Sequence, residues 1–368
     1  MRLERSSGRG RPENPRARRA QQGGAPSGPN APGASEEGVK VSVCCITYNQ
    51  AGTIRQCLEA ILTQEAPFNF EILVHDDASS DGTSQIIQEF SAANPAKFRT
   101  ILQELNTYSQ GIDPFATLIN MASGQYIALC EGDDYWTDAL KLATQAELLD
   151  RNLDVDICSH ECAHLYIGYG EAGEDILDTP AAWTGQRFFT VADVITNVNS
   201  QRERFAHTMS LMLRRSAAQR FASFAARSRH LRASDKFIKF FGAERGGGVA
   251  IGAVMGVHRV NSAGSWTSQV RSDAAFRIHN TTAKIRALIE LRAQASPRSV
   301  AFVEQACRIE IVKLALHKDF APSKRLAYLA STLPRLGAIQ AGRAVVAIAG
   351  RLIANRVRSL VKAKGSAR

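Results

Sequence analysis

Between residues 41 and 136 the sequence repeatedly passes from a β-rich run to a polar cluster and then to a segment with helical spacing. The β-rich runs are residues 41–47, 70–75, 98–104 and 125–130. The segments with helical spacing are residues 53–63, 84–93 and 115–122. Strands that alternate with helices in this way predict an α/β fold with a doubly wound, mostly parallel sheet. Ligands of such sheets bind beyond the carboxyl ends of the strands, so the same pattern predicts where a functional site lies.

Three polar clusters follow strands of the predicted sheet, at residues 47–49, 76–81 and 131–134. Because parallel strands end at one edge of a sheet, we expect these clusters to meet in one crevice. The acidic cluster alone is equally well explained as a turn that caps a helix beginning near Thr137 and Asp138. Three polar loops on the same edge are not explained by capping, and they favour a functional site.

The neighbouring carboxylates of Asp133 and Asp134 are candidate ligands for a metal ion. Adjacent carboxylates repel each other, and a hard divalent cation relieves that repulsion. Mg²⁺ and Mn²⁺ suit oxygen donors and leave coordination positions for phosphate oxygens. We therefore expect Mg²⁺ or Mn²⁺ at this position.

The charge distribution argues against a nucleic-acid-binding protein. The chain has 368 residues and a formal net charge of +10, but residues 1–34 carry seven Arg and two Glu, and residues 322–368 carry ten Lys or Arg and no acid. The remainder is therefore mildly acidic, which does not suit contact with a phosphate backbone along the main surface. Residues 1–38 have almost no large apolar side chains, so we expect a disordered basic tail, with or without a binding role.

The seven cysteines lie largely within apolar segments, and their odd number favours buried thiols in a reducing compartment. Cys158, His160, Cys162 and His164 alternate as possible zinc ligands. On a strand, such residues lie about 6–7 Å apart along one face and cannot surround one tetrahedral ion. We therefore do not expect these four residues to form a zinc site.

The C-terminal third is predicted to be helical. Helical spacing at 278–295, 299–318 and 323–333 predicts a helical extension over residues 271–333, after a domain at 39–270. Residues 334–368 form a basic amphipathic segment with apolar side chains on one side and Arg and Lys largely opposite. Such a helix either lies on an anionic membrane surface or docks on the domain. Because the sequence has no apolar run of 18 residues and no apolar core of a signal peptide, we expect a cytoplasmic protein. It either stays in the cytoplasm or binds peripherally to the inner face of the cell membrane.

The ordered set of motifs resembles glycosyltransferase family 2, whose members have the GT-A fold. The resemblance covers roughly residues 40–265. Its signatures are Val-Ser-Val-Cys-Cys-Ile-Thr-Tyr-Asn at 41–49, His-Asp-Asp-Ala-Ser-Ser-Asp-Gly-Thr at 75–83, and Glu-Gly-Asp-Asp-Tyr-Trp at 131–136. Each piece alone is weak, whereas the three in this order are specific.

The resemblance implies a role for each matching residue. Thr47 and Asp77 would face the nucleotide base, Asp133 the ribose, and Asp134 the metal ion that bridges the diphosphate. Asn49 is a further candidate for nucleotide-sugar binding, although it could simply hold its loop in shape.

Inverting relatives use a carboxylate near the start of a later helix as the base that activates the acceptor hydroxyl. Asp235, after Ser234, stands at the matching position, and the alternative is an ordinary first-turn helix residue. Residues 200–210 are expected to line the acceptor side, where His207 has either a functional or a structural role.

Residues 249–266 resemble the aromatic-Arg-x-His segment of bacterial members, with two departures. His258 replaces the aromatic residue and Asn261 replaces the His. Arg259 is retained as a candidate diphosphate partner, because a planar guanidinium suits phosphate oxygens. The alternative for Arg259 is a surface residue of a strand.

Together, these features imply a metal-assisted, inverting enzyme that moves a sugar from a UDP-type or dTDP-type donor to a hydroxyl of a cell-surface glycan or lipid-linked acceptor. One alternative is a sugar-phosphate nucleotidyltransferase, but residues 47–50 do not form its Gly-rich phosphate loop. The other is a catalytically silent relative that binds nucleotide sugar.

Overall fold

The computed structural model describes residues 38–170, 173–196, 206–228, 230–231, 234–260, 262 and 273–365. The chain divides into two units, Met1–Glu36 and Glu37–Arg368, and the fold concerns the second. The tail predicted for residues 1–38, apart from its last residue, lies outside the described residues, as do Asn261 and residues 200–205 of the expected acceptor side.

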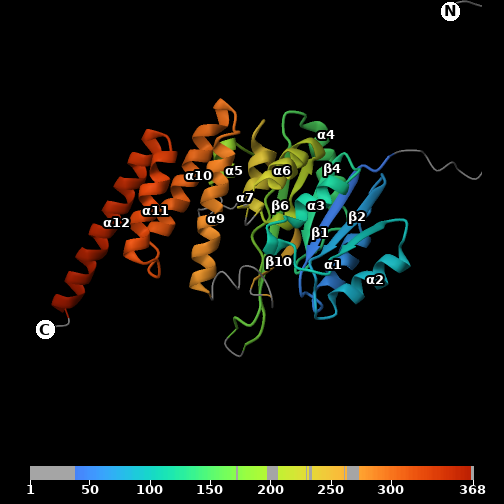
Figure 1. The fold of residues 1–368 in the computed structure, drawn as a ribbon. Coiled ribbons are helices and arrows are strands. Elements are labelled where there is room, and N and C mark those ends of the chain that lie inside the picture. The colour runs from blue at the N-terminus through green and yellow to red at the C-terminus, as the bar shows by residue number, and fades with distance from the viewer. Residues whose placement is uncertain are drawn as a thin grey trace, which may run out of the picture. The chain divides into compact units, whose positions relative to one another are not determined.

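Strands and helices alternate through the first half of the fold (Figure 1). The strands are β1 (Val41–Thr47), β2 (Phe70–Asp76), β3 (Phe98–Leu102), β4 (Tyr126–Glu131), β5 (Tyr135–Trp136), β6 (Ile157–Tyr166), β7 (Ile176–Asp178), β8 (Gln186–Phe189), β9 (Met212–Arg214) and β10 (Gly248–Val260). The helices are α1 (Ile54–Leu62), α2 (Thr83–Ala93), α3 (Pro114–Met121), α4 (Lys141–Arg151), α5 (Val191–Thr196), α6 (Arg215–Arg227), α7 (Asp235–Ala243), α9 (Ala274–Arg292), α10 (Pro297–Ala315), α11 (Pro322–Thr332) and α12 (Ala338–Gly365). The short 3₁₀ turns are η1 (Tyr108–Gln110), η3 (Thr208–Ser210) and η4 (Leu333–Arg335).

One mixed sheet organises the described part of the chain, in the order β3-β2-β1-β4-β9-β6-β10-β5. Its first half is parallel: β1 pairs with both β2 and β4, and β2 pairs with β3. Parallel neighbours require crossover connections, which α1, α2 and α3 supply. The short β9 is antiparallel to β4 and β6 and joins the parallel half to the parallel β6–β10 pair. The predicted α/β fold with a mostly parallel sheet is confirmed.

Helices cover both faces of this sheet. Successive side chains of β1 point to opposite faces, so Cys44 packs in one apolar core while Val43 and Cys45 pack in the other. The first core includes residues of α3, α6, α7, α9 and α10, and the second includes residues of α1 and α4. In Figure 1 the orange α9 and α10 lie on the α7 side of the sheet, with α11 and α12 beyond them, away from α1 and α2. All seven cysteines are buried and free.

The predicted start of a helix near Thr137 and Asp138 is wrong. Tyr135 and Trp136 instead form β5, which pairs with Val257 and Gly256 of β10, and α4 begins only at Lys141. The pairing partner lies more than one hundred residues later in the chain, so no local pattern around residue 137 indicates it.

The helical extension is present, and it docks through both polar and apolar contacts. The Nζ atom of Lys236 in α7 donates to Oε1 of Glu310 in α10 at 2.6 Å, and both side chains are buried. In α12, Ile348 packs against Val312. This part of the amphipathic segment therefore docks on the extension, which is the alternative to membrane contact given above. None of the described helices is long and apolar enough to cross a membrane.

Candidate active site

The carboxyl ends of β1, β2 and β4 lie side by side. Thr47 is the register partner of Asp76 in β2, and Ile46 is the partner of Glu131 in β4. The backbone N–H of Gly132 then donates to the carbonyl oxygen of Ile46 at 2.9 Å. The three polar loops therefore leave the sheet at one edge, as expected for strands that run parallel.

Gly132 allows the acidic loop to lie against the first loop. A Cβ atom at this position would lie 2.6 Å from Oε1 of Gln50 and 2.8 Å from Oγ1 of Thr47. Thr47, which is almost fully buried, donates its hydroxyl to Gln50 Oε1 at 2.8 Å. The Gln50 side chain in turn hydrogen-bonds to Asp133. Thr47 is thereby connected to the acidic loop through one side chain.

Asn49 joins the first and second loops. It has a left-handed backbone with φ of 51°, a conformation that Asn adopts more readily than most residues. Its side-chain oxygen accepts from the backbone N–H of Ser80 at 2.8 Å, and its own N–H donates to Oγ of Ser79 at 2.8 Å. These contacts favour the loop-holding role for Asn49 over direct contact with a nucleotide.

Asp77 orders the segment that follows β3. Its Oδ1 accepts from the N–H and hydroxyl of Thr107 at 2.7 and 2.6 Å, and its Oδ2 accepts from the N–H of Tyr108 at 3.1 Å. The side chain is buried. Asp76 bonds instead to Ser79 and Ser84 within its own loop and helix. Asp77 thus positions the loop that borders the predicted base-binding side.

Glu131, Asp133 and Asp134 form an acidic cluster with perturbed protonation. Burial, followed by the charges of Asp133 and Asp235, raises the pKa of Glu131 to about 8. Burial and the charges of Asp133 and Glu131 hold the pKa of Asp134 well above its usual value, and burial also raises the pKa of Asp133. A hard divalent cation bound at Asp133 or Asp134 would offset the repulsion among these carboxylates.

Two contacts orient the cluster. The backbone N–H of Arg259 in β10 donates to Oδ1 of Asp134 at 2.8 Å. The hydroxyl of Ser262 donates to Oδ2 of Asp133 at 2.7 Å. Each aspartate therefore has one oxygen fixed by a neutral donor from the β10 segment, and Asp133 is held by Gln50 as well.

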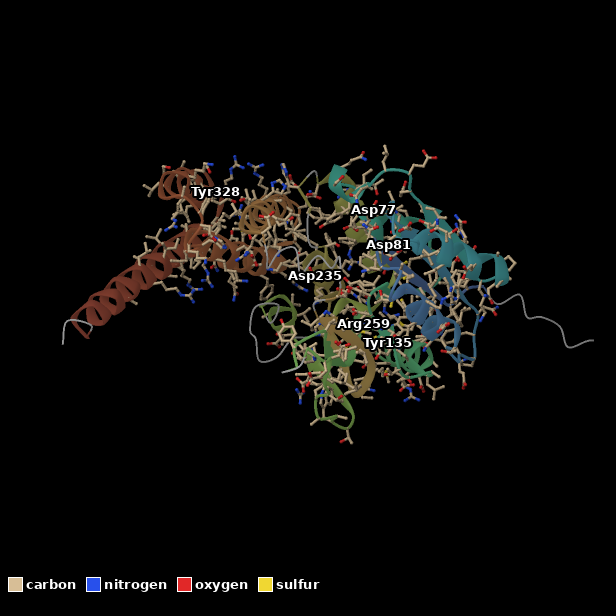
Figure 2. All side chains as sticks on the ribbon, turned by 90° about the horizontal axis from the view of Figure 1, so that it is seen from below. Asp77, Asp81, Tyr135, Asp235, Arg259 and Tyr328 are labelled. Atoms are coloured by element: carbon tan, nitrogen blue, oxygen red, sulfur yellow. The ribbon has the colours of Figure 1, made fainter. Side chains whose placement is uncertain are left out.

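The Arg259 guanidinium lies against the acidic loop. Its Nη1 donates to the carbonyl oxygen of Asp133 at 2.6 Å, and its Nη2 donates to Oε1 of Gln56 in α1. The guanidinium also lies over the ring of Tyr135, 4.6 Å from the centroid, and Figure 2 labels both residues. A cation held by an aromatic ring and a backbone carbonyl retains donors for an anionic ligand.

Asp235 is the first residue of α7. Its charge acts on Glu131 strongly enough to contribute to the raised pKa of that residue. Its carboxylate oxygen lies 3.9 Å from Nζ of Lys239, one turn later in the helix, and the side chain is partly exposed. The N-cap of α7 is Ser234, which makes no side-chain capping bond. Its side chain instead bonds to Asp113 at the start of α3.

Sequence reasoning gave no role to Glu131 or Lys239. Glu131 is the last residue of β4 and hydrogen-bonds to Thr208. Its position at a strand end, close to two aspartates in the sequence, could have indicated that it belongs to the site. Lys239 follows Asp235 at helical spacing, which places the two on one face of α7. Its Nζ also donates to the carbonyl oxygen of Ala206 at 2.6 Å, a contact that no sequence pattern indicates.

The fold is that of GT-A glycosyltransferases. The structure of residues 1–349 of Staphylococcus aureus TarS in complex with UDP-GlcNAc aligns with a TM-score of 0.60 at 15% identity, covering 84% of this chain and 88% of that one. Such a match at low identity establishes the fold.

The chain belongs to glycosyltransferase family 2 and is a glycosyltransferase. Residues 42–172 match the family model described as glycosyl transferase family 2. The uncharacterized protein Rv1520 of Mycobacterium tuberculosis is 31% identical over 255 residues, which are 68% of each chain. The Escherichia coli UDP-Glc:alpha-D-GlcNAc-diphosphoundecaprenol beta-1,3-glucosyltransferase WfgD is 35% identical over 113 residues, 30% of this chain and 42% of that protein.

Proposed function

We propose that this glycosyltransferase moves a sugar from a nucleoside diphosphate to a hydroxyl group of a cell-surface glycan or its lipid-linked precursor, with inversion and with the assistance of Mg²⁺ or Mn²⁺. The observation that carries the proposal is the approach of Asp235 to the cluster of Glu131 and Asp133. It puts a partly exposed carboxylate beside the group of acids that suits a cation. The names of WfgD and of the TarS complex include UDP-sugars and support a uridine donor, with a thymidine donor as the second candidate.

In the proposed mechanism, Asp235 accepts the proton of the acceptor hydroxyl as that oxygen attacks the anomeric carbon. Lys239 orients the Asp235 carboxylate from one helical turn away. Asp134 would hold the divalent ion, with Asp133 toward the ribose, and the bound ion would stabilise charge on the departing diphosphate. Arg259 would add donors to the same phosphate oxygens.

The base of the nucleotide is proposed to lie between the first and second loops. Thr47 borders this side from β1, and Asp77 borders it from β2 with the segment it orders at Thr107. Asn49 contributes by fixing the two loops to each other. Family membership argues against the nucleotidyltransferase alternative, and the silent relative is the alternative that experiment must exclude.

A donor panel tests the proposal directly. Purified protein is incubated with UDP-, dTDP-, GDP- and ADP-sugars in Mn²⁺, in Mg²⁺ or in a chelator, and release of nucleoside diphosphate is measured. We expect release from a uridine or thymidine donor, only when the divalent ion is present. Anomeric configuration of the product, read by NMR, reports inversion. Absence of diphosphate release from every donor, at all ion concentrations, would identify a silent relative.

We further propose that α12 brings a cytoplasmic protein to an anionic membrane face. Val345, Val346 and Leu352 are exposed apolar residues of this helix, and Arg343 and Arg351 are exposed basic ones. Exposed apolar and basic side chains together favour the interface of an anionic bilayer.

We expect the full chain to co-sediment with vesicles that contain anionic lipid and not with neutral ones. Because each basic residue near such a surface contributes about 1 kcal/mol, reversing Arg343 and Arg351 to Glu should weaken partitioning by at least roughly 30-fold. The matched control reverses Arg55 and Arg151, which are exposed on α1 and α4 and change the net charge equally. Equal losses in both pairs would refute a specific role for α12.

A further inference from the structure

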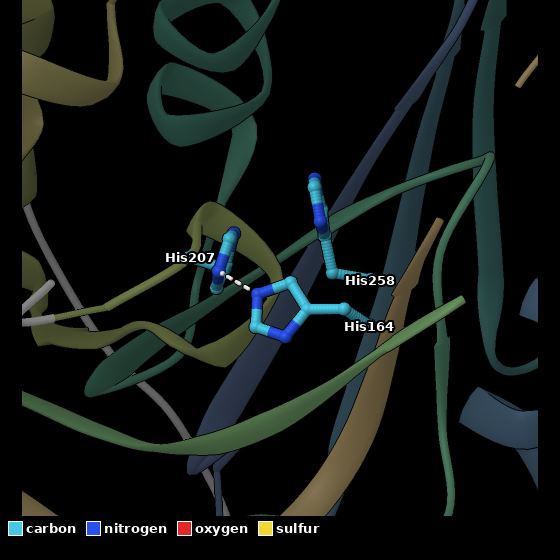
Figure 3. A group of neighbouring side chains, drawn as sticks. All are labelled: His164, His207 and His258. Atoms are coloured by element: carbon cyan, nitrogen blue, oxygen red, sulfur yellow. Dashed lines mark hydrogen bonds between the residues drawn. The ribbon is translucent and has the colours of Figure 1, made fainter. Parts of the chain in front are cut away.

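Three histidines from separate parts of the chain converge in one cluster (Figure 3). His164 lies in β6, His258 lies in β10, and His207 directly precedes η3. One ring nitrogen of each lies within 4.8 Å of those of the others. The Nε2 atoms of His164 and His207 are 2.9 Å apart, and the rings of His207 and His258 stack with centroids 4.2 Å apart.

Regular structure builds this arrangement. His164 and His258 are register partners in the parallel β6–β10 pair, so their side chains leave the same face of the sheet. His207 is held by the η3 turn, where the hydroxyl of Ser210 donates to the His207 carbonyl oxygen at 2.7 Å. Trp136 Nε1 anchors the same turn through the carbonyl oxygen of Met209 at 2.9 Å.

We propose that His164, His207 and His258 form a binding site for a borderline transition-metal ion of the Zn²⁺ type, with a fourth position open to water or an anionic ligand. Imidazole nitrogens prefer such ions, whereas carboxylate oxygens prefer Mg²⁺ and Mn²⁺. Three histidines with one open position are an established zinc geometry. The site therefore differs in donor chemistry from the acidic cluster around Asp134.

The spacing of the nitrogens fits this proposal after small ring movements. Zn–N bonds of about 2.0–2.1 Å in a tetrahedron place the nitrogens about 3.3 Å apart. The Nε2 atoms of His164 and His207 are 2.9 Å apart, and the three ligand nitrogens all lie within 4.8 Å of one another. Without an ion, one of the two facing Nε2 atoms of His164 and His207 carries the proton of their hydrogen bond. On binding, that ring takes the tautomer protonated at Nδ1, and its Nε2 lone pair becomes a ligand.

The site lies next to the acidic cluster along the chain. His258 precedes Arg259, whose N–H binds Asp134, and His207 precedes Thr208, whose side chain bonds to Glu131. These contacts couple the two sites through adjacent residues, but the ligands belong to different elements. Variants can therefore remove either donor set separately.

The test compares metal binding by wild type and two kinds of variant. Metal-free protein is titrated with Zn²⁺ against a chromophoric chelator, and Co²⁺ is added separately to read the absorption of a tetrahedral ion. We expect one Zn²⁺ per chain in wild type and in Asp134→Asn. His258→Phe keeps a ring that can stack on His207 but removes a metal ligand. It should therefore weaken Zn²⁺ binding by at least roughly 100-fold, more than is usual when a residue that only hydrogen-bonds to a ligand is replaced. His207→Asn should do the same.

The outcomes separate the proposal from its alternatives. A wild type that binds no Zn²⁺ would identify a metal-free cluster of stacked, hydrogen-bonded histidines. Zn²⁺ binding that Asp134→Asn abolishes, or that His258→Phe and His207→Asn leave unchanged, would assign the ion to other ligands. Circular dichroism and thermal unfolding establish that each variant is folded, and His164→Gln replaces any that is not. A negative result in this test would not contradict the proposed sugar transfer, because the donor panel tests that transfer separately.

Discussion

Asp235→Asn is expected to reduce sugar transfer by about 10²–10⁴-fold, the range typical of losing a general base. The amide keeps the size of the side chain but cannot accept the proton of the acceptor hydroxyl. Affinity for nucleoside diphosphate should remain, because the contacts proposed for the nucleotide come from the loops after β1, β2 and β4 and from Arg259 in β10. The measurements are the transfer rate at saturating donor and the dissociation constant of the nucleotide.

Asp273→Asn provides the matched control. Asp273 is also an acid at a helix start, and its Oδ1 caps α9 by accepting from the N–H of Phe276 at 3.0 Å. Asn caps helices about as well as Asp, so this variant repeats the charge change and should leave transfer unchanged. If Asp235→Asn retained full transfer, or if both variants lost it equally, the assignment of the base would be wrong.

Much of the fold could be predicted because its signals are local. The predicted boundaries of β1, β2, α2 and α3 lie within one residue of those observed, since apolar periodicity and the polar residues at strand ends coincide there. The start of α4 could not be predicted, because β5 exists only through its pairing with β10. Periodicity can be recognised in a short window of sequence, whereas the pairing register of two strands that are far apart in the chain cannot.

The candidate site also has some features that the sequence predicts and others that it does not. The meeting of the loops after Thr47, Asp76 and Glu131 follows from parallel topology alone, so the sequence predicts it. The approach of Asp235 to Glu131 came from family resemblance, because more than one hundred residues separate them. The histidine cluster was missed because His164 was considered with neighbours on its own strand, whereas its partners come from β10 and the η3 turn.

Asp134→Asn should abolish divalent-metal-dependent donor binding and reduce transfer by about 10³-fold or more, since a bound ion contributes several kcal/mol of charge stabilisation. Isothermal titration of nucleotide with and without Mn²⁺ measures the first effect. Asp138→Asn makes the same charge change nearby, and its Oδ1 only caps the turn before α4 through the N–H of Leu140 at 2.8 Å. Metal-dependent binding that survives in Asp134→Asn, or is lost equally in Asp138→Asn, would contradict the assignment.

Thermal stability adds an independent test, because the pKa of Asp134 is held well above its usual value by burial and by the charges of Asp133 and Glu131. In metal-free protein near pH 8, the Asp134 carboxyl group is ionised in the unfolded chain. In the folded chain this group either keeps its proton or is a buried charge, and both cost free energy, so folding is disfavoured. Below the ordinary aspartate pKa of about 4 both states are protonated and this cost vanishes. Asp134→Asn should therefore raise the unfolding temperature near pH 8 and change it little at low pH. Mn²⁺ should stabilise wild type but not the variant, because a ligand stabilises only the state that binds it. A variant that is less stable than wild type near pH 8 without metal would show that Asp134 serves the fold rather than a cation.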